Sequence, residues 1–374
     1  MLKKVLLFSL SVLILSCSSE KENADNISNN LTTFTNKNDN IILDTNLGEK
    51  LADNEANLTN IIENTIIESL KKEYPSGIVK RDAHAKHHGC VKASFKINNS
   101  AVNDKFKVGV FSENNKEYKA WIRFSNGSKN NDTEKDVRGF AIKLMGVEGA
   151  KLLNEESNEK TQDFLMINNS AMFINDLNAY IDLVKATSGG SIAQFALKHP
   201  VIAYKILQAT SKKVDSPLNS DYFSTTPYKL GNTAIKFKVK PCSTSTAKPD
   251  NSSDFLRKEL SKSLKQKDAC FDFQIQERKG TFNDMPIEDS TVDWSTSNSP
   301  YITIARITIP KQDFESPEQM SFCENMSYTP WHSLPEHKPL GSLNRVRKQV
   351  YTAISKFRHS KNNQVRKEPV DFNF

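Results

Sequence analysis

The 374-residue sequence contains little proline and little cysteine. It has 14 prolines and five cysteines, and no two cysteines form a CxxC pair of the kind that binds structural zinc. A hydrophobic content of 37% is normal for a globular chain. The composition leaves room for a sizeable core in one large domain or two ordinary ones, and it gives no support to a metal module built from cysteines.

Long runs of one charge are also absent. The 51 basic and 44 acidic residues give a formal charge of +7, but the two signs are interspersed along the chain. A chain that binds nucleic acid usually gathers its basic residues in a stripe or a tail. We therefore expect no nucleic-acid partner and interpret the charge as a mixed, solvated surface.

The marked hydrophobic run, from Val5 to Leu15, lies at the N-terminus and is short. It covers about 11 residues, whereas a helix needs about 20 to cross a bilayer. Lys3-Lys4 precedes the run and Ser16-Cys17 follows it. We predict that residues 1–17 form a signal peptide that is removed on export.

The end of this segment, Ile14-Leu15-Ser16-Cys17, resembles the lipobox of bacterial lipoproteins. The resemblance implies that Cys17 becomes the first residue, that its thiol carries a diacylglycerol and that its new amine is acylated. Several acyl chains would anchor the protein stably to a membrane of the bacterial cell envelope, on its periplasmic or surface side. The alternative is an ordinary signal peptide with a cysteine there by chance.

Export bears on the other cysteines, because disulfides persist outside the cytoplasm. Cys90, Cys242, Cys270 and Cys323 remain after Cys17 is assigned to lipid. The most plausible bridge joins Cys242 to Cys270. The alternative is four free, buried thiols.

Residues 18–60 are predicted to be a disordered polar tether. They are rich in Asn, Ser, Thr, Asp and Glu, and their apolar residues follow no period. Helical spacing begins near Leu58 and ends before Pro75. We therefore place the folded domain at residues 61–374.

Beyond Pro75, apolar residues alternate with polar ones, as in half-buried antiparallel strands. The alternating stretches are 106–110, 120–124, 140–144, 235–239, 271–275 and 302–309. In the last stretch the alternation slips at Ala305-Arg306, which predicts a β-bulge. Helical spacing returns in 176–186, 192–208 and 343–357. We predict an α+β fold in which an antiparallel β-barrel is surrounded by helices.

The densest polar cluster runs from Arg81 to Gly89 and reads RDAHAKHHG. Three histidines in five residues suggest a metal site, since His84 and His88 could share one face of a helix. No acidic residue lies between them as in the HExxH zinc motif, and Gly89 argues against a long helix. Zinc is an alternative at this point.

The segment RDAHAK, which holds His84, resembles the part of haem catalases that carries the distal histidine. Three more motifs follow in the order that this family has them: WIRFS at 121–125, DVRGFAIK at 136–143 and DFLMINNSAMF at 163–173. Four motifs in the right order are hard to produce by chance. The chain is therefore identified as similar to the haem catalase family, and its fold is expected to be catalase-like.

A fifth motif lies near the C-terminus. On a helix, Arg347, Tyr351 and Arg358 would fall within about 40° of one another. The family has the same Arg-x-x-x-Tyr spacing, with another arginine seven residues later, on the helix beneath the haem. The resemblance implies that Tyr351 is the axial ligand of the haem iron and that Arg347 stabilises its phenolate. Taken alone, the trio would be read as the solvated face of an amphipathic helix.

The resemblance also implies roles on the distal side. His84 would take a proton from the peroxide and return it, Asn168 would hydrogen-bond the peroxide, and Ser125 would orient the His84 ring. Tyr180 falls near where the family stacks an aromatic ring on the haem.

Three arginines match family positions that bind the propionates of haem b. They are Arg81, Arg123 and Arg358. A planar guanidinium group suits a carboxylate because it donates two parallel hydrogen bonds. The expected cofactor is therefore haem b.

The chain departs from the family's pattern in several places. His87 stands where the family usually has glycine and could crowd the distal side, and Ile167 stands where glycine is common. Residues 187–317 resemble the longer members hardly at all. The stretches TPWH at 329–332 and EHKPLG at 336–341 instead resemble a pattern of the smaller catalase-like haem enzymes.

The expected function is haem-dependent breakdown of hydrogen peroxide by a membrane-tethered lipoprotein. One alternative is a haem peroxidase or an enzyme that converts lipid hydroperoxides, as some of the smaller relatives do. Another is a lipoprotein that binds haem without turnover. Retention of both His84 and Asn168 weighs against the last, because a carrier needs only the proximal side.

Overall fold

The computed structural model describes residues 41–244, 247–281 and 283–373. The predicted signal peptide, Cys17 and residues 18–40 of the expected tether lie outside these described residues. From Leu43 onward the chain forms one unit with its own hydrophobic cores. Within the described ranges, no helix combines the length and apolar character needed to span a bilayer.

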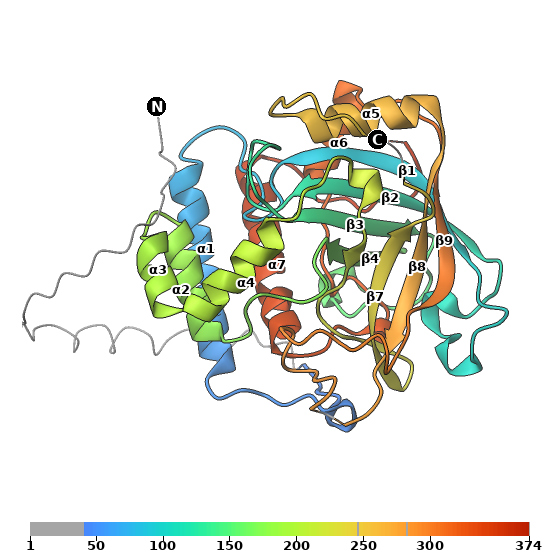
Figure 1. Cartoon of the computed structure of the whole chain (residues 1–374), viewed down its shortest axis with the longest axis horizontal. Helices are drawn as coiled ribbons and strands as arrows, with labels where there is room; N and C mark the ends of the chain where they lie inside the picture. The colour runs from blue at the N-terminus through green and yellow to red at the C-terminus, as the bar shows by residue number, and fades with distance from the viewer. Residues whose placement is uncertain (1–40, 245–246, 282, 374) are drawn as a thin grey trace, which may run out of the picture. The chain divides into compact units, whose positions relative to one another are not determined.

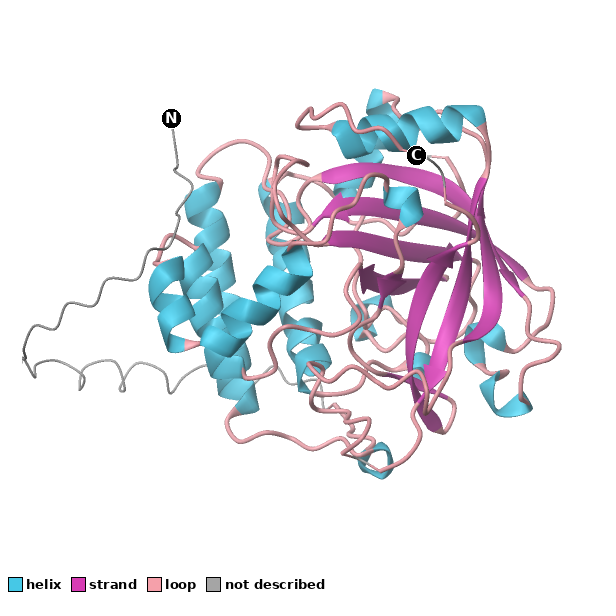
Figure 2. Cartoon of the chain, viewed as in Figure 1, coloured by secondary structure: helices cyan, strands magenta, loops and turns pink. Residues whose placement is uncertain are grey.

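Nine strands form one antiparallel sheet (Figure 2). They are β1 His87–Ile97, β2 Glu117–Asn126, β3 Arg138–Met145, β4 Thr161–Ile167, β5 Tyr222–Phe223, β6 Tyr228–Leu230, β7 Thr233–Pro241, β8 Ala269–Glu277 and β9 Ile302–Ile309. The short strand β5 pairs with both β4 and β7 and so closes eight of the strands into a barrel, while β6 pairs with β7. The predicted α+β fold with an antiparallel barrel is confirmed.

The interior of the barrel is a packed aromatic core. The ring of Phe164 on β4 lies 5.2 Å from Phe273 on β8 and 5.3 Å from Phe237 on β7. Phe95 on β1 lies 5.2 Å from Phe273. Because these side chains alternate inward along each strand, they fill the barrel. Any site must therefore lie at an end or on the outside of the barrel.

In the described ranges, seven α-helices lie around the barrel. They are α1 Glu55–Glu73, α2 Leu177–Thr187, α3 Ile192–Lys198, α4 Pro200–Thr210, α5 Phe255–Gln266, α6 Pro317–Asn325 and α7 Ser342–Lys361. Figure 1 shows α7 standing between the barrel and the pair α1 and α2. Apolar residues of α1, α2 and α7 form a second core, so one side of α7 is anchored and the other is left for the barrel.

The predicted strands agree with the structure at β2, β3, β7, β8 and β9. The bulge in β9 is present, because Phe273 pairs with Ala305 while Gln274 pairs with Thr303. The prediction for 106–110 was wrong, since this stretch forms two 3-10 turns, Asp104–Phe106 and Gly109–Phe111. Gly109 has a φ of 54°, which does not fit an extended strand.

The predicted helices also agree, with one split and two omissions. The single helix expected over 192–208 is divided into α3 and α4, and Pro200 begins α4 because its ring suits the first helical position. Helices α5 and α6 were not predicted. Both lie against β1 (Figure 1).

The predicted boundary at residue 60 was wrong for the end of the tether. Glu49 and Glu55 are buried and form ion pairs with Arg345 of α7, at 2.9 Å and 2.6 Å. Helix α1 also begins before Leu58, at Glu55. These residues are held by charge and not by an apolar stripe, so a search for hydrophobic periodicity misses them.

Two disulfides are present among the described residues. Cys242 and Cys270 are joined as predicted. A second disulfide, which was not predicted, joins Cys90 on β1 to Cys323 on α6. It links segments 233 residues apart in the sequence. Spacing along the chain gives no hint of such a pair.

Candidate active site

His84 lies in the segment that enters β1 and is held there by backbone bonds. Its N–H donates to the carbonyl of Gly127 at 2.6 Å, and the N–H of Asn126 donates to the carbonyl of Lys86 at 2.9 Å. The φ of His84 is 60°, a left-handed conformation that is uncommon for residues other than glycine. Such conformations often occur where function requires a side chain in one place.

The hydrogen bonds of the His84 ring define its tautomer. Nδ1 lies 2.9 Å from the carbonyl oxygen of Asn126 and 3.0 Å from Oγ of Ser125. A backbone carbonyl can only accept, so Nδ1 carries the hydrogen. Nε2 is then an unprotonated acceptor, and no described residue bonds to it.

The environment of His84 keeps its ring neutral. Burial, and secondly the positive charge of Arg123, lower the pKa of His84 to about 4. Although the ring lies deep in the protein, part of the His84 surface is still accessible. A neutral imidazole with a free Nε2 is suited to take up a proton at neutral pH.

Gly139 explains how the His84 ring can lie so close to the sheet. A Cβ atom at this position would be 2.5 Å from Nδ1 of His84 and 2.5 Å from Oγ of Ser125. Both distances are too short for any side chain to fit. The glycine of the DVRGFAIK motif is therefore required by the ring that packs on it, a role that sequence reasoning did not assign.

Asn168 lies at the same end of the sheet. It follows Ile167, which pairs with Gly139 on β3, and Gly139 pairs with Ser125 on β2. Oδ1 of Asn168 accepts the N–H of Arg138 at 2.7 Å. No described residue bonds to Nδ2, so its two hydrogens are left for a ligand.

Asp136 and Arg138 shape the loop that receives His84. The carboxylate of Asp136 accepts the backbone N–H groups of Gly127, Ser128 and Lys129 at 2.8–2.9 Å. Arg138 bonds to Oδ1 of Asn126 and to the carbonyl of Asp132. These contacts fix the carbonyls to which His84 bonds. The motif containing both residues was noted in the sequence, but their positioning role was not predicted.

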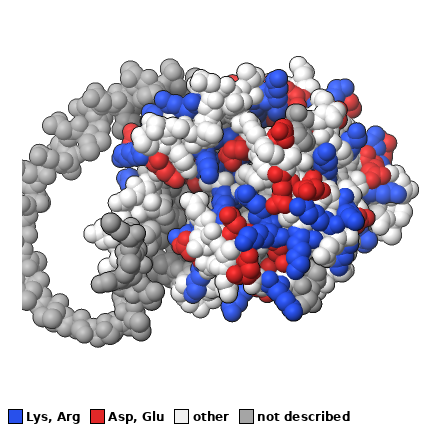
Figure 3. All heavy atoms as spheres, turned by 90° about the horizontal axis from the view of Figure 1, so that it is seen from above, with Lys and Arg blue, Asp and Glu red and all other residues white. Residues whose placement is uncertain are grey.

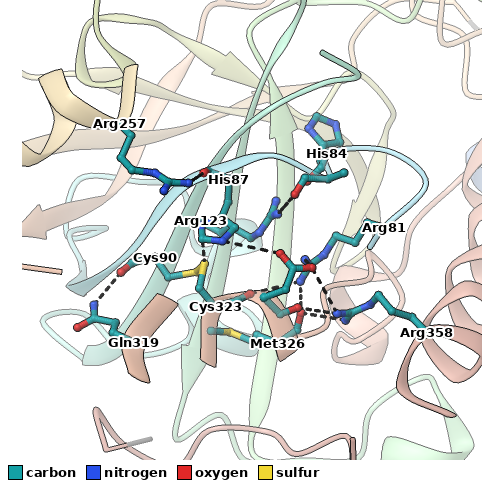
Figure 4. Close-up of a disulfide and its surroundings, with 12 residues drawn as sticks. Arg81, His84, His87, Cys90, Arg123, Arg257, Gln319, Cys323, Met326 and Arg358 are labelled. Carbon is teal, nitrogen blue, oxygen red and sulfur yellow. Dashed lines mark hydrogen bonds and ion pairs between the residues drawn. A yellow bond between two sulfur atoms is a disulfide. The ribbon is translucent and has the colours of Figure 1, made fainter. Parts of the chain in front are cut away.

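Three arginines from distant parts of the chain converge beside this segment (Figure 4). Arg123 and Arg358 are buried, and Arg81 is nearly so. Burial, and secondly Arg81, lower the pKa of Arg358 to about 9, and burial and Arg81 also hold the pKa of Arg123 well below its usual value. The structure thus brings together the three residues predicted to bind propionates.

The nearby carboxylate is that of Glu324, just beyond the disulfide. It lies 3.2 Å from Nη1 of Arg81 and 3.8 Å from Nη1 of Arg358. His87 adds no charge, because burial and Arg123 lower its pKa to about 2. Three guanidinium groups against one carboxylate leave an excess of positive charge, which suits the anionic propionates of a haem.

The arginines also hold backbone carbonyls. Nη2 of Arg123 donates to the carbonyl of His84 at 2.8 Å, while its Nε is buried without a partner. Arg81 and Arg358 both donate to the carbonyl of Met326, after α6. An orphaned guanidinium N–H beside excess positive charge fits a site for an anionic group.

Helix α7 supplies Arg347 and Tyr351. Tyr351 is half-buried and lines a cavity of about 200 Å³ together with Tyr328 and Ser355, among others. Nη1 of Arg347 donates to Oγ1 of Thr226 at 3.3 Å, and no hydrogen bond joins it to Tyr351 among the described residues. The charge of Arg347 contributes a little to lowering the pKa of His84.

Tyr180 on α2 packs against the core shared with α7. Burial, followed by Asp82 and Tyr351, raises its pKa. It therefore stays a neutral phenol near Tyr351, and its expected place beside the haem stays a prediction.

His87 does not crowd the His84 ring. Its Nδ1 lies 3.5 Å from Sγ of Cys323, and its Nε2 lies 3.7 Å from Glu324. Figure 4 shows it beside the disulfide. It therefore faces α6 and not Asn168.

The zinc alternative finds no support in the described ranges. The one group of described residues with metal-ligand spacing is Glu156, His332 and Glu368. That group is already neutralised, since Lys143 donates to Glu368 at 2.6 Å and Arg366 bonds to Glu156. His84 and His88 do not form a shared site, because His88 is buried in β1 and His84 precedes the strand.

Comparisons with known proteins agree with this geometry. Residues 37–212 match the family model for catalase. A solved fungal catalase is 18% identical, with a TM-score of 0.60, over 78% of this chain and 62% of that one. Catalase A from Saccharomyces cerevisiae is 18% identical, with a TM-score of 0.61, over 78% of this chain and 64% of that one. The chain thus spans less than two thirds of the length of either, and no curated protein matches it.

Proposed function

The chain belongs to the catalase family, and we propose that it binds haem b and breaks down hydrogen peroxide. The observation that carries the proposal is the fixed, neutral His84 ring, whose Nε2 is free at the end of the sheet where Asn168 presents a free amide. The arginine cluster of Arg81, Arg123 and Arg358 supplies the charge that two propionates need.

A bound haem would supply the iron that takes oxidising equivalents from one peroxide and passes them to a second. Arg81, Arg123 and Arg358 would hold its propionates, and Tyr351 would bind its iron. Arg347 lies one helical turn before Tyr351 on α7. Within the described ranges the cysteines are paired in disulfides, so those residues offer no thiol for covalent attachment of the haem. This supports haem b.

The distal residues would handle the protons. Nε2 of His84 takes the proton from one oxygen of the peroxide and returns it to the other oxygen, which leaves as water. Ser125 and the carbonyl of Asn126 keep Nδ1 protonated, so Nε2 points its lone pair at the substrate. Nδ2 of Asn168 donates to the peroxide and holds it in place. Release of oxygen from a second peroxide completes the turnover.

The first experiment measures haem binding and oxygen release on the full chain supplied with haem. We expect a Soret band and oxygen evolution from hydrogen peroxide. Replacing His84 with Ala should keep the Soret band and lower oxygen evolution by about 100-fold or more. The control is His199→Ala, because this half-buried histidine bonds to Asp182 on α2, away from the distal loop. Unchanged activity of the His84 variant would overturn its assignment.

A second variant tests the proximal side. Replacing Tyr351 with Phe should weaken haem binding and change the absorption spectrum, because the phenolate ligand is lost. An unaltered spectrum would remove Tyr351 as the ligand.

A different peroxide is the second candidate substrate. The lipobox at Cys17 would hold the enzyme at a membrane, where lipid hydroperoxides form, and this favours a peroxidase or lipid-hydroperoxide activity. Oxygen release from hydrogen peroxide, compared with loss of a fatty-acid hydroperoxide, separates the two activities. A chain that binds haem and consumes neither would be a haem-binding lipoprotein.

The proposed lipid anchor rests on the sequence Ile14-Leu15-Ser16-Cys17. Expression of the full chain with labelled palmitate should give a labelled, membrane-bound product. Replacing Cys17 with Ala should abolish the label and release the protein from the membrane fraction. A labelled Cys17→Ala protein would contradict the assignment.

A further inference from the structure

The helices α3 and α4 carry an apolar surface that no part of the described chain covers. Leu197, Val201, Tyr204 and Leu207 are each between 53% and 84% exposed. None of them belongs to a hydrophobic core of the domain. We call these four residues, with Ile192, the α3–α4 face.

The α3–α4 face is continuous because of how the two helices are built. Val201, Tyr204 and Leu207 follow one another at steps of three residues along α4 and therefore lie on one side of it. Leu197 is in the last turn of α3, just before Pro200 begins α4. The opposite side of α3 is anchored, because Phe195 is buried and His199 bonds to Asp182 of α2 at 2.8 Å. The apolar face is therefore held outward.

The sequence that forms this face carries positive charge and no negative charge of its own. Residues 185–213 contain five lysines and no Asp or Glu. Lys198 pairs with Asp182, and Lys212 bonds to Asn169. Lys185 and Lys213 are exposed and have no ion-pair partner among the described residues. Elsewhere the charges are mixed, as Figure 3 shows on the face seen from above.

We propose that the α3–α4 face rests on a lipid bilayer that contains anionic headgroups. Exposed apolar residues bordered by lysines are typical of helices that lie at a membrane interface, because the apolar side chains enter the acyl boundary while the lysines reach the headgroups. The predicted lipid on Cys17 would hold the chain at such a surface. A second copy is a poorer occupant, because two faces of the same positive charge would repel each other.

This contact would also place the membrane near the distal side. Lys212, two residues after α4, donates to the carbonyl of Asn168 at 3.2 Å. The docking proposal itself rests on the exposed face and its charge, and it holds or fails independently of the peroxide chemistry.

The test uses residues 43–374, supplied with haem, because this unit contains every described core and lacks the anchor. It is mixed with vesicles of phosphatidylcholine, alone or with phosphatidylglycerol, and its sedimentation with them is measured. We expect binding to the anionic vesicles that weakens as salt is added. Replacing Val201 and Leu207 together with Glu should lower the partition coefficient about tenfold or more.

The matched control replaces Val365 and Val370 with Glu. Both are more than three quarters exposed and lie on the C-terminal segment. The control should bind vesicles as the unmodified unit does, and circular dichroism should be the same for all three proteins. The proposal is overturned if the unmodified unit does not bind anionic vesicles or if the Val201/Leu207 variant binds them equally well. Light scattering that shows a dimer lost in that variant would assign the face to a second copy and would also overturn it.

Discussion

The disulfide between Cys90 and Cys323 should stabilise both the fold and the arginine cluster. It joins β1 to α6 with its two Cα atoms 5.5 Å apart. Nε2 of Gln319, one turn earlier on α6, donates to the carbonyl of Cys90 at 2.8 Å. The carbonyls just beyond the disulfide, at Glu324 and Met326, accept from Arg358 at 2.5 Å and 3.5 Å. The end of α6 is therefore both fastened to the barrel and bonded to an arginine of the site (Figure 4).

The expected loss of stability follows from the length of chain that the disulfide closes. Cys90 and Cys323 are 233 residues apart, and Cys242 and Cys270 are 28 apart. Loop-closure entropy gives an upper value of about 5.5 kcal/mol for the first pair and about 3.6 kcal/mol for the second. We therefore expect Cys90→Ala/Cys323→Ala to lose about 2 kcal/mol more free energy of unfolding than Cys242→Ala/Cys270→Ala. Urea unfolding without reductant measures both.

The two variants should differ even more in haem binding. Loss of Cys90–Cys323 frees the end of α6, so that Arg81 and Arg358 are no longer held by its carbonyls. A haem titration followed at the Soret band should then show at least about tenfold weaker binding. In the Cys242→Ala/Cys270→Ala control, the lost bridge joins the residue after β7 to the second residue of β8. This control should bind haem as the native chain does. Equal haem affinity in both variants, or a larger loss in the control, would refute the reasoning.

Two further predictions concern His84. Replacing Gly139 with Ala should move the imidazole of His84, since the new Cβ would lie 2.5 Å from Nδ1. The variant should keep the Soret band and lose about 100-fold in oxygen release. Full activity would contradict the packing argument. Because the folded pKa of His84 is about 4 and lies below the ordinary value of 6.5, its contribution to stability is complete above pH 6.5 and is lost as the pH falls towards 4. Urea unfolding should therefore show that the free energy of unfolding declines, through this group, by up to about 1.4 kcal/mol per pH unit. Protonation of His84 should not lower oxygen release until the pH nears 4. Half-loss of activity near pH 6.5 would count against a neutral, buried ring.

The barrel could be predicted where the strands are long and amphipathic. Alternation in β2, β3, β7, β8 and β9 reflects side chains that point in turn to the core and away from it. Closure of the barrel could not be predicted in this way. It depends on Tyr222–Phe223, a two-residue strand that is too short to show a period.

Alternation over a few residues can also mislead. Phe106 and Val110 are both buried, yet they belong to separate 3-10 turns. The N–H of Val110 donates to Nε2 of His337, which is 227 residues away, so it takes no part in a strand ladder. A contact over that distance leaves no trace in local spacing.

The site shows the same division between local and distant information. The positions of His84, Asn168 and Ser125 were marked by local motifs. The register of β2, β3 and β4 brings Ser125 and Asn168 to one end of the sheet, where a backbone bond to Gly127 holds His84. The resemblance of these motifs to the catalase family indicated which chemistry to expect. The hydrogen bond from Nδ1 to the Asn126 carbonyl, which sets the tautomer, required the structure.

The arginine cluster shows why composition alone cannot reveal a cofactor site. Taken singly, Arg81, Arg123 and Arg358 resemble the many solvated basic residues of a chain with mixed charge. They differ from those residues because they are buried in one place. There the charge of Arg81 helps to lower the pKa of Arg123 and of Arg358, and the carboxylate of Glu324 offsets only part of the positive charge. A folded chain keeps such an arrangement when a ligand supplies the missing negative charge. The excess positive charge in this cluster, more than any single motif, is the observation that supports the proposed binding of a cofactor with carboxylates.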